Sequence, residues 1–210
     1  MKWKIAIAIP ARLNSSRLKH KMLMPFDGKP LIQNVFEKVN TFGFDTFVLT
    51  DSKRIAKHIP EENVIMTGKE ENGTARICSC FTQFFDYDYV INIQGDMLDI
   101  ERKTIEPIIN NINSDRQLLT AYVKGYDPKG VKIIHQDGYA CWFTRKDIGY
   151  GDKHLGIYAY PIMFLDRYWG LTENYPEEDL EQNRILGSFW RIKAIEVKYD
   201  GREINTKNDL

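Results

Sequence analysis

Apolar and polar positions follow two different periods along the first half of the chain. Four mainly apolar segments are typical of buried strands: 3–9, 46–50, 64–66 and 89–93. Between them, apolar side chains recur at helical spacing in three segments: 31–39, 55–59 and 74–85. Strands that alternate with helices predict right-handed crossovers, and therefore an α/β fold with a mostly parallel sheet flanked by helices.

The pattern changes after residue 117, where apparent strands follow one another with little helix between them. They cover four segments: 118–123, 131–135, 140–144 and 155–160. The dipeptide Asp137-Gly138 predicts a tight hairpin between the second and third of these strands. Two helices, 161–169 and 179–186, and a strand at 193–197 complete the pattern. We therefore expect a small antiparallel ribbon in the second half.

Composition narrows the class of protein. A chain of 210 residues, 43% hydrophobic, can bury one core, so we expect a single domain over 1–210. The 29 basic and 29 acidic residues balance, which argues against nucleic acid or an anionic membrane as a partner. No apolar run approaches the roughly 20 residues of a membrane span, and the first residues lead directly into a strand. We therefore expect a cytoplasmic protein.

A basic loop follows the first strand and is the first candidate site. It carries Arg12, Ser15, Arg17 and Lys21 just beyond the strand's carboxyl end. In open α/β sheets ligands bind at that edge, and guanidinium and ammonium groups match phosphate oxygens. The loop therefore predicts a site for a nucleotide or another polyphosphate. The alternative is that these cations are solvated surface charges.

Asp96 ends the segment Asn92-Ile93-Gln94-Gly95-Asp96, directly after the fourth predicted strand. Because carboxyl ends of parallel strands meet at one edge of a sheet, we expect Asp96 to lie near the basic loop. A carboxylate beside bound phosphates favours Mg²⁺, which takes one or two carboxylates together with substrate oxygens. The alternative is that Asp96 only caps the next turn.

Several short motifs, in this order, give the chain a specific resemblance. They are Ile9-Pro10-Ala11-Arg12, Ser16-Arg17-Leu18 with Lys21, Gly28-Lys29-Pro30-Leu31-Ile32, Gly73-Thr74 with Arg76, Asn92-Ile93-Gln94-Gly95-Asp96, Gly138-Tyr139-Ala140, Lys153-His154-Leu155-Gly156-Ile157-Tyr158 and Leu180-Glu181-Gln182. Over nearly the whole chain the sequence resembles the sugar-acid cytidylyltransferase family, and within it most closely the CMP-Kdo synthetases (3-deoxy-manno-octulosonate cytidylyltransferases).

The resemblance implies a Rossmann-like fold and a reaction that joins CTP to a 2-keto sugar acid, releasing pyrophosphate. It further implies Mg²⁺ as cofactor, a possible homodimer and a place in lipopolysaccharide biosynthesis. It makes 1–115 the nucleotide-binding half and 116–210 the half for sugar binding and dimerisation.

Site residues are carried over by position. The implied CTP-binding residues are Arg12, Ser15, Arg17, Lys21, Asn72, Gly73, Thr74 and Arg76. Those implied for the sugar are Gln94, His154, Tyr158, Glu181 and Gln182. Asp96 and Asn205 would hold the metal, and Arg12, Lys21 and Asp96 would carry catalysis by positioning and charge neutralisation.

Three of these assignments have structural alternatives. His154 precedes a strand and is equally interpretable as a structural histidine with satisfied hydrogen bonds. Glu181, Gln182 and Arg184 have the spacing of an exposed helix face. Arg76 has possible surface partners in the nearby glutamates at 70 and 71.

The chain departs from the family pattern at three places. Asn205 stands where the family has a metal-binding aspartate, so we expect Mg²⁺ to be held more weakly or recruited with CTP. Met97-Leu98 replaces a Glu-Pro pair, and the segment 145–154 is shorter. Two alternatives therefore stay open: a cytidylyltransferase for another acceptor, such as a sialic-type acid or a polyol phosphate, and a non-catalytic protein that binds a nucleotide or sugar acid.

Overall fold

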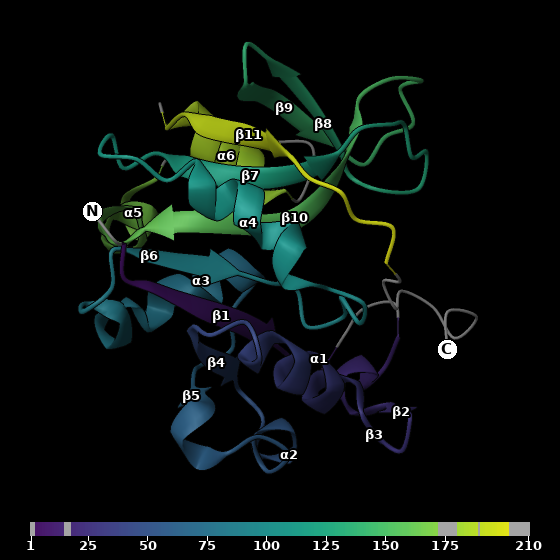
Figure 1. Cartoon of the computed structure of the whole chain (residues 1–210), viewed down its shortest axis with the longest axis vertical. Coiled ribbons are helices and arrows are strands. Elements are labelled where there is room, and N and C mark those ends of the chain that lie inside the picture. The colour runs from purple at the N-terminus through teal and green to yellow at the C-terminus, as the bar shows by residue number, and fades with distance from the viewer. Residues whose placement is uncertain (1–2, 15–17, 172–179, 189, 202–210) are drawn as a thin grey trace. The chain divides into compact units, whose positions relative to one another are not determined.

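The computed structural model describes residues 3–14, 18–171, 180–188 and 190–201 (Figure 1). The chain forms two compact units. Unit 1 runs from the amino terminus to Arg102 and is joined by the chain from Asp200 onward, and unit 2 is Lys103–Tyr199. The boundary falls at the start of a helix, α4 (Arg102–Asn110), that the apolar pattern did not predict. No helix in the described part of the chain is long and apolar enough to cross a bilayer.

Unit 1 contains four parallel strands, in the spatial order β5 (Val64–Met66), β4 (Asp45–Thr50), β1 (Ile5–Ala11) and β6 (Tyr89–Asn92). The centre of β1 is buried on both faces, which explains its unbroken apolar sequence. Ala8 lies opposite Phe47 on one side and opposite Asn92 on the other. The carboxyl ends of β1 and β6 are therefore neighbours, as the sequence predicts.

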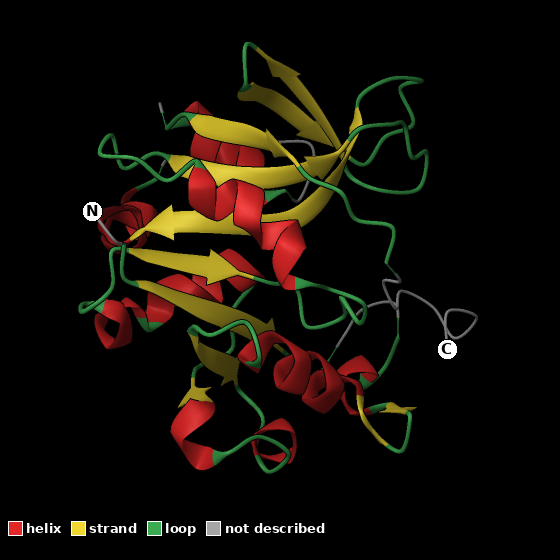
Figure 2. Ribbon diagram, viewed as in Figure 1, coloured by secondary structure: helices red, strands yellow, loops and turns green. Residues whose placement is uncertain are grey.

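Helices and short turns connect these strands (Figure 2). They are η1 (Lys21–Leu23), the two-stranded ribbon β2 (Pro25–Phe26) and β3 (Lys29–Pro30), α1 (Leu31–Asn40), α2 (Lys53–Ala56), η2 (Glu61–Asn63), α3 (Gly73–Ser79) and η3 (Phe81–Phe84). α1 buries the apolar stripe read from the sequence, including Leu31, Val35 and Val39. Ser52 stands at the predicted amino-terminal cap of α2, but its side chain makes no capping hydrogen bond.

The single helix predicted over 74–85 is wrong in its second half. Helix α3 ends at Ser79, and Cys80 leaves helical geometry with φ −121° and ψ 24°. The tighter turn η3 that follows directs Phe84 into the core, where it packs edge-on against Phe47. Phe85 consequently points outward and is 63% exposed, whereas the sequence pattern placed it inside.

Unit 2 has a mixed sheet. Its strands lie in the order β10 (Asp152–Pro161), β7 (Leu118–Val123), β11 (Ile192–Glu196), β9 (Tyr139–Thr144) and β8 (Lys132–Gln136). Only the β7–β11 pairing of this order is parallel, and β8 also pairs with the start of β10. The expected mostly parallel sheet is therefore found in unit 1 alone. The expected antiparallel ribbon is confirmed in β8 and β9, within a mixed α/β fold.

The hairpin between β8 and β9 turns where the sequence predicts it. Asp137 and Gly138 both have positive φ, 52° and 79°. Two successive positive φ values give the twist that matches the flanking strands, and Asp-Gly adopts them at low cost.

Strand β10 has an irregularity that matters for the candidate site. Its register with β7 shifts between His154 and Tyr158, and Gly156 within the shift has φ 70°. Thr120 of β7 donates its hydroxyl proton to the Ile157 carbonyl at 2.8 Å. Glycine therefore supplies the left-handed conformation that the bulge requires. Three helical segments complete unit 2: α5 (Ile162–Arg167), η4 (Tyr168–Gly170) and α6 (Glu181–Gly187).

Candidate active site

Lys21 and Asp96 form an ion pair at the carboxyl edge of the unit 1 sheet. Lys21 is the first residue of η1, and Asp96 follows β6. The Lys21 Nζ donates to Oδ2 of Asp96, and the two side chains are only 11% and 19% exposed. The structure thus brings together the cation and the carboxylate that the sequence placed at one edge. Such a partly desolvated pair interacts more strongly than a surface pair.

The backbone around this pair is tightly packed. A Cβ added at Gly95 would lie 3.1 Å from the Met22 sulfur and 3.2 Å from Cδ1 of Ile32. Glycine therefore allows the loop that carries Asp96 to lie against η1 and α1. The Leu31 N–H donates to the Met24 carbonyl at 2.9 Å, which joins η1 to the start of α1. Lys21 is consequently held by packing rather than left on a free loop.

Arg12 lies just beyond β1 and is exposed. Its Nη1 donates to the Glu71 carbonyl at 3.4 Å, which joins the loop after β1 to the loop before α3. Most of the guanidinium's donors remain available to an anion, because one weak hydrogen bond uses a single N–H. Two predicted phosphate ligands, Ser15 and Arg17, lie outside the described residues.

The segment predicted to border the base forms the first turn of α3. Asn72 caps the helix, since its Oδ1 accepts from the Ala75 N–H at 2.7 Å. A Cβ on Gly73 would lie 3.4 Å from Cγ of Pro10, so this turn packs on the end of β1. Thr74 is fully buried. The segment therefore lies beside the basic loop that follows β1. Within the segment, Asn72 and Thr74 support the folded structure.

Arg76 is buried in unit 1, unlike the surface residue of the alternative interpretation. It is only 2% exposed, so the surface pairing with glutamates 70 and 71 is wrong. Its Nη1 donates to the Thr67 hydroxyl and, at 3.1 Å, to the Gly68 carbonyl, while Nη2 lies 3.6 Å from Oδ2 of Asp51. These are all protein contacts. The geometry favours Arg76 as a residue that shapes the wall of the site over one that binds CTP directly.

On unit 2, two of the predicted sugar residues present buried polar atoms without a partner. The Tyr158 hydroxyl and Oε1 of Gln182 are buried, and neither makes a hydrogen bond of regular geometry among the described residues. Burial raises the pKa of Tyr158, and the nearby Gln182 and Thr120 side chains oppose that rise. Tyr158 is therefore a neutral phenol, able to donate one hydrogen bond and accept another.

His154 is held by the protein itself. It is 6% exposed, and its Nε2 lies 2.9 Å from the Thr120 hydroxyl. Because that hydroxyl donates its proton to the Ile157 carbonyl, Nε2 carries the hydrogen and donates to Thr120. Burial lowers the pKa of His154 to about 3, so the ring is neutral. Its contacts with the Phe143 and Tyr158 rings complete a structural environment, and direct sugar binding by His154 stays a prediction.

The remaining sugar-side candidates are divided between the two units. Gln94 follows β6 in unit 1 and is half-buried, and Glu181 is half-buried at the start of α6. The exposed-helix-face alternative is wrong for Gln182, which is 5% exposed.

Sequence reasoning missed Asn183, whose amide accepts from the Phe143 N–H at 3.0 Å and donates to its carbonyl at 2.9 Å. The signal available in the sequence was the position of Asn183 directly after the motif residues Glu181 and Gln182. Its two hydrogen bonds fix α6, and with it Gln182, against β9.

Among the described residues, no group of three or more His, Cys, Asp or Glu side chains gathers at a possible metal site. Asp96 by itself fits Mg²⁺ only if substrate phosphates supply further oxygens, which is the usual arrangement for this ion. Asn205, the second predicted ligand, lies outside the described residues. The donor set is thus compatible with a cation that arrives with a nucleotide.

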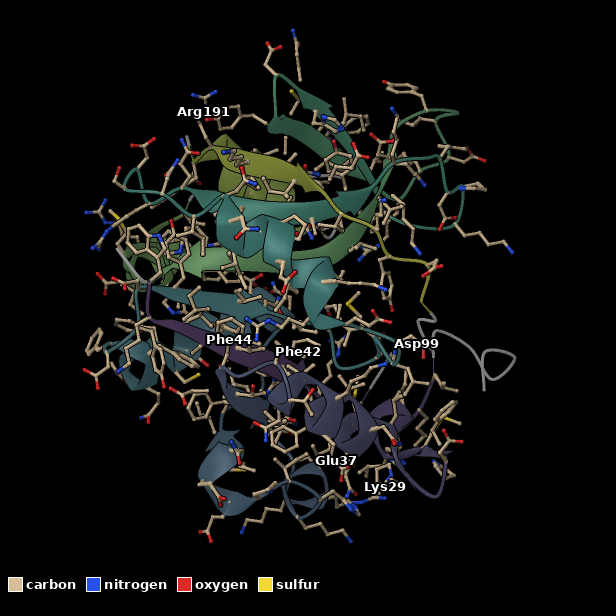
Figure 3. The ribbon with its side chains drawn as sticks, in the orientation of Figure 1. Lys29, Glu37, Phe42, Phe44, Asp99 and Arg191 are labelled. Carbon is tan, nitrogen blue, oxygen red and sulfur yellow. The ribbon has the colours of Figure 1, made fainter. Side chains whose placement is uncertain are left out.

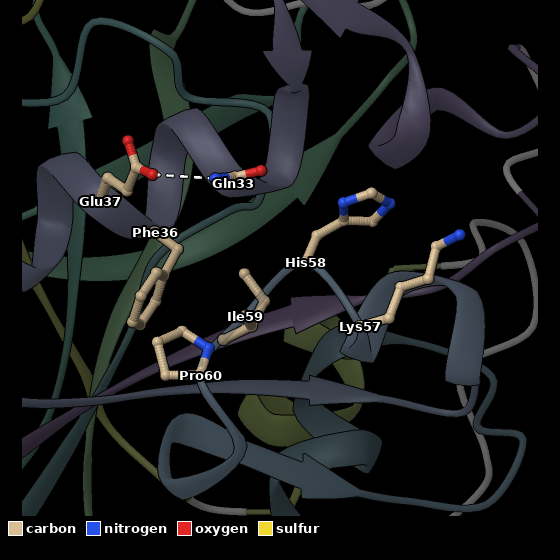
Figure 4. A pocket seen from close by; sticks show the side chains of 7 residues that line it. All are labelled: Gln33, Phe36, Glu37, Lys57, His58, Ile59 and Pro60. Atoms are coloured by element: carbon tan, nitrogen blue, oxygen red, sulfur yellow. Dashed lines mark hydrogen bonds between the residues drawn. The ribbon is translucent and has the colours of Figure 1, made fainter.

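A pocket of about 400 Å³ lies elsewhere in unit 1, between α1 and the segment after α2 (Figure 4). Its lining residues are Gln33, Phe36, Glu37, Lys57, His58, Ile59 and Pro60. The Glu37 carboxylate already accepts a hydrogen bond from Lys29 at 2.6 Å (Figure 3) and one from Gln33 at 2.9 Å (Figure 4), and these hydrogen bonds lower its pKa. No predicted site residue lines this pocket.

Comparison with known proteins shows the family of this chain. Residues 6–189 match the cytidylyltransferase family. The 3-deoxy-manno-octulosonate cytidylyltransferase of Francisella tularensis strain FSC 198 is 36% identical, covering 98% of this chain and 95% of the relative. The 8-amino-3,8-dideoxy-manno-octulosonate cytidylyltransferase of Shewanella amazonensis is 35% identical, again covering 98% and 95%.

The fold also matches a solved structure. A CMP:2-keto-3-deoxy-manno-octonic acid synthetase, determined in complex with CTP, superposes with a TM-score of 0.87 at 31% identity. The match covers 98% of this chain and 94% of that one. The similarity thus extends through both units.

Proposed function

Because this chain belongs to the cytidylyltransferase family, we propose that it transfers the cytidylyl group of CTP to a 2-keto sugar acid of the 3-deoxy-manno-octulosonate (Kdo) class. The products would be a CMP-sugar and pyrophosphate. The observation that carries the proposal is the pairing of Lys21 with Asp96 at the sheet edge, beside the loop that bears Arg12. Relatives named as 3-deoxy-manno-octulosonate cytidylyltransferases, and a related structure with CTP bound, support it.

In this reaction the anomeric hydroxyl oxygen of the sugar acid bonds to the α-phosphorus of CTP. The bond from that phosphorus to the bridging oxygen of the β-phosphate breaks, pyrophosphate leaves with the bonding electrons, and the hydroxyl proton passes to solvent or a nearby base. No covalent enzyme intermediate is required. Lys21 would stabilise the charge that develops on the departing pyrophosphate, and Arg12 would orient the triphosphate. Catalysis would rest on positioning and charge neutralisation.

Mg²⁺ would be held by Asp96 and, through a neutral carbonyl oxygen, by Asn205, together with phosphate oxygens of CTP. When bound, it would neutralise phosphate charge and orient the triphosphate. The Asp96 carboxylate is paired with Lys21 in this structure. When the metal and the triphosphate bind, the ion pair would therefore separate. Asp96 would then pair with the cation, and Lys21 with a phosphate oxygen.

The acceptor would be recognised on unit 2. The Tyr158 hydroxyl and the Gln182 amide oxygen, which make no hydrogen bond of regular geometry among the described residues, offer the mixed donor and acceptor groups that sugar hydroxyls pair with. Glu181 would add a further contact, while His154 would hold Tyr158 in place through ring contact. A homodimer in the cytoplasm that supplies an activated sugar acid for lipopolysaccharide follows from the family resemblance.

A second acceptor has direct support. The Shewanella relative, named for 8-amino-3,8-dideoxy-manno-octulosonate, is nearly as similar to this chain as the Francisella one. The two acceptors differ at carbon 8, where an amine replaces a hydroxyl. The amine is cationic at neutral pH, so a carboxylate such as Glu181 near that carbon would favour it.

Pyrophosphate release tests the proposal. The purified chain is incubated with CTP, Mg²⁺ and one of four acceptors: Kdo, its 8-amino analogue, a sialic acid or a polyol phosphate. Release with either octulosonate, with the CMP-sugar identified by mass, is the expected result. Turnover of only the sialic acid or the polyol phosphate would show that the acceptor belongs to that class and not to the Kdo class. CTP binding without release from any acceptor would favour a non-catalytic binding protein.

A further inference from the structure

Asn92, the last residue of β6, carries an unexplained buried amide. It is 1% exposed, and its Oδ1 has no hydrogen-bond partner among the described residues. A buried amide oxygen without a donor destabilises the folded state by about as much as a lost hydrogen bond. Such a group in a folded protein therefore needs a specific explanation. A ligand that brings its own donor is one such reason.

The surroundings of this amide contain few donors. The position that a Cβ on Gly73 would occupy lies 3.9 Å from Nδ2 of Asn92 and 3.4 Å from Cγ of Pro10. Pro10 has no N–H and Gly73 has no side chain, so neither residue brings a side-chain donor to Oδ1. A Cβ at Gly73 would be in ordinary van der Waals contact with the Pro10 and Asn92 side chains.

Asn92 and Asp96 belong to opposite sides of the same sheet edge. Helix α1 connects β1 to β4, whereas α3 connects β5 to β6 and so crosses the sheet in the opposite direction. Right-handed crossovers that run in opposite directions place their helices on opposite faces (Figure 1). Gly95, beside Asp96, packs on Ile32 of α1, whereas Asn92 lies next to Gly73 of α3. The amide is thus separate from the Lys21–Asp96 pair.

The chemistry of CTP narrows what Oδ1 accepts from. Ionised phosphates carry only acceptors, so they cannot satisfy an amide oxygen. Cytosine has an exocyclic amino group that donates, and uracil carries a carbonyl oxygen at the same position. An acceptor in donor-poor surroundings therefore favours cytosine and disfavours uracil, which would place two acceptors against each other.

We infer that Asn92 is a specificity-determining residue, whose amide oxygen accepts a hydrogen bond from the 4-amino group of the CTP base. The inference rests on the proposed function, since it takes CTP as the nucleotide. Gly73 and Pro10 lie beside the amide and bring no side-chain donor to it.

The test compares CTP with UTP as the nucleotide for Kdo, using pyrophosphate release by the full chain. In Asn92→Leu, kcat/KM for CTP should fall by roughly 10- to 100-fold, the effect of one buried hydrogen bond, while that for UTP changes little. Gly73→Ala should lower the CTP-to-UTP ratio in the same direction, because its methyl group would cover the amide. Alanine also favours the helix more than glycine does, so this variant is expected to fold.

Asn63→Leu is the matched control, because the Asn63 amide already donates to the Thr46 carbonyl at 2.9 Å. It should leave the CTP-to-UTP ratio unchanged. An equal loss for CTP and UTP in Asn92→Leu would overturn the inference and make Asn92 structural. The inference would also be overturned if Asn92→Leu changed the ratio of kcat/KM for CTP to that for 2′-deoxy-CTP but left the CTP-to-UTP ratio unchanged. The amide would then bind the ribose and not the base.

The two failures are distinguishable. If the wild-type chain releases no pyrophosphate, the proposed function fails, and calorimetric binding of CTP and UTP to wild type and Asn92→Leu still tests the inference. A preference of the wild type for CTP that the variant loses would support it. Equal binding of the two nucleotides by the wild type would overturn it.

Discussion

Under the proposed function, the ion pair of Lys21 with Asp96 prepares a site for an anion. Burial removes most of the water around the ammonium group, and Asp96 compensates its charge in the absence of substrate. A triphosphate with its metal ion offers both groups new partners of opposite charge, so the exchange leaves neither charge unpaired. Lys21 is therefore placed before substrate arrives, which reduces the reorganisation that the reaction requires.

Lys21→Met should lower kcat/KM for CTP by roughly 10²- to 10³-fold, the range for loss of one preorganised group that stabilises developing charge. Methionine keeps most of the aliphatic stem and removes the charge. Lys19→Met is the control, because Lys19 is exposed two residues away in the same loop. Steady-state kinetics would show the loss in the first variant only. Equal kinetics for the two variants would contradict the role of Lys21.

His154 makes stability depend on pH. Its pKa is lowered to about 3 in the folded protein, against about 6.5 when unfolded, so the unfolded chain binds the additional proton between those values. Stability is therefore full above pH 6.5 and decreases as pH falls, by about 1.4 kcal/mol per unit well below 6.5.

Urea unfolding at pH 7 and pH 5 measures this dependence. Relative to His154→Phe, which keeps a ring among Phe143 and Tyr158, the wild type should lose about 2 kcal/mol more over that interval. The other titrating groups are common to both proteins and cancel in the difference. Parallel curves would show that His154 is protonated in the folded state.

At the scale of elements, the sequence predicted best where the chain repeats a simple pattern. The strands of unit 1 and the apolar stripe of α1 follow directly from their periodicity. The break at Cys80 could not be read from the sequence, because the apolar spacing of Phe81 and Phe84 continues a helical pattern across it. Helix α4 contains Pro107, a residue that ordinarily argues against a helix.

The candidate site, like the fold, could be predicted from the sequence only in part. Lys21 and Asp96 were placed together from strand order alone, because carboxyl ends of neighbouring parallel strands share an edge. The partners of Arg76 and His154 were not predictable, since Asp51 and Thr120 lie far from them in sequence. Tertiary contacts of this kind determine whether a polar residue faces a ligand or supports the fold.

Lys132 shows how one buried charge organises two loops of unit 2. It is fully buried, and its ammonium group donates to three backbone carbonyls, those of Pro128, Gly130 and Arg145. The loops before β8 and after β9 are thereby joined at one point. The shorter segment after Arg145 is consequently anchored at its start.

Lys132→Met should lower the free energy of unfolding by about 2–4 kcal/mol, because three carbonyls lose a charged donor while the burial cost of the ammonium is relieved. Lys129→Met, at an exposed position in the same loop, should change it by less than about 0.5 kcal/mol. Denaturant unfolding of both variants makes the comparison. Wild-type stability in Lys132→Met would mean that the carbonyls find other donors.

At the scale of the whole molecule, charge is balanced overall and concentrated locally. Equal numbers of acidic and basic residues give no net field, so attraction of a triphosphate depends on the few cations near the sheet edge. The residues assigned to the nucleotide belong to unit 1, and most of those assigned to the acceptor belong to unit 2. The two substrates would thus be selected by separate parts of the chain.

Under the proposed function, the strength of Mg²⁺ binding depends on the charge of its ligands. With Asn205 in place of an aspartate, the chain supplies one negative charge fewer to Mg²⁺. Asn205→Asp should therefore lower the Mg²⁺ concentration that gives half-maximal pyrophosphate release, by roughly tenfold for one added carboxylate. Asn208→Asp is the control for a charge added nearby. An identical metal titration for the two variants would remove Asn205 from the site.

The most direct test of the central claim is a crystal structure of the chain with CTP and Mn²⁺, which replaces Mg²⁺ and is located by its anomalous scattering. The account predicts a manganese peak within coordinating distance of the Asp96 carboxylate, with the Lys21 Nζ hydrogen-bonded to a phosphate oxygen of the same nucleotide. A triphosphate bound away from the Lys21–Asp96 edge, with that ion pair intact, would contradict it.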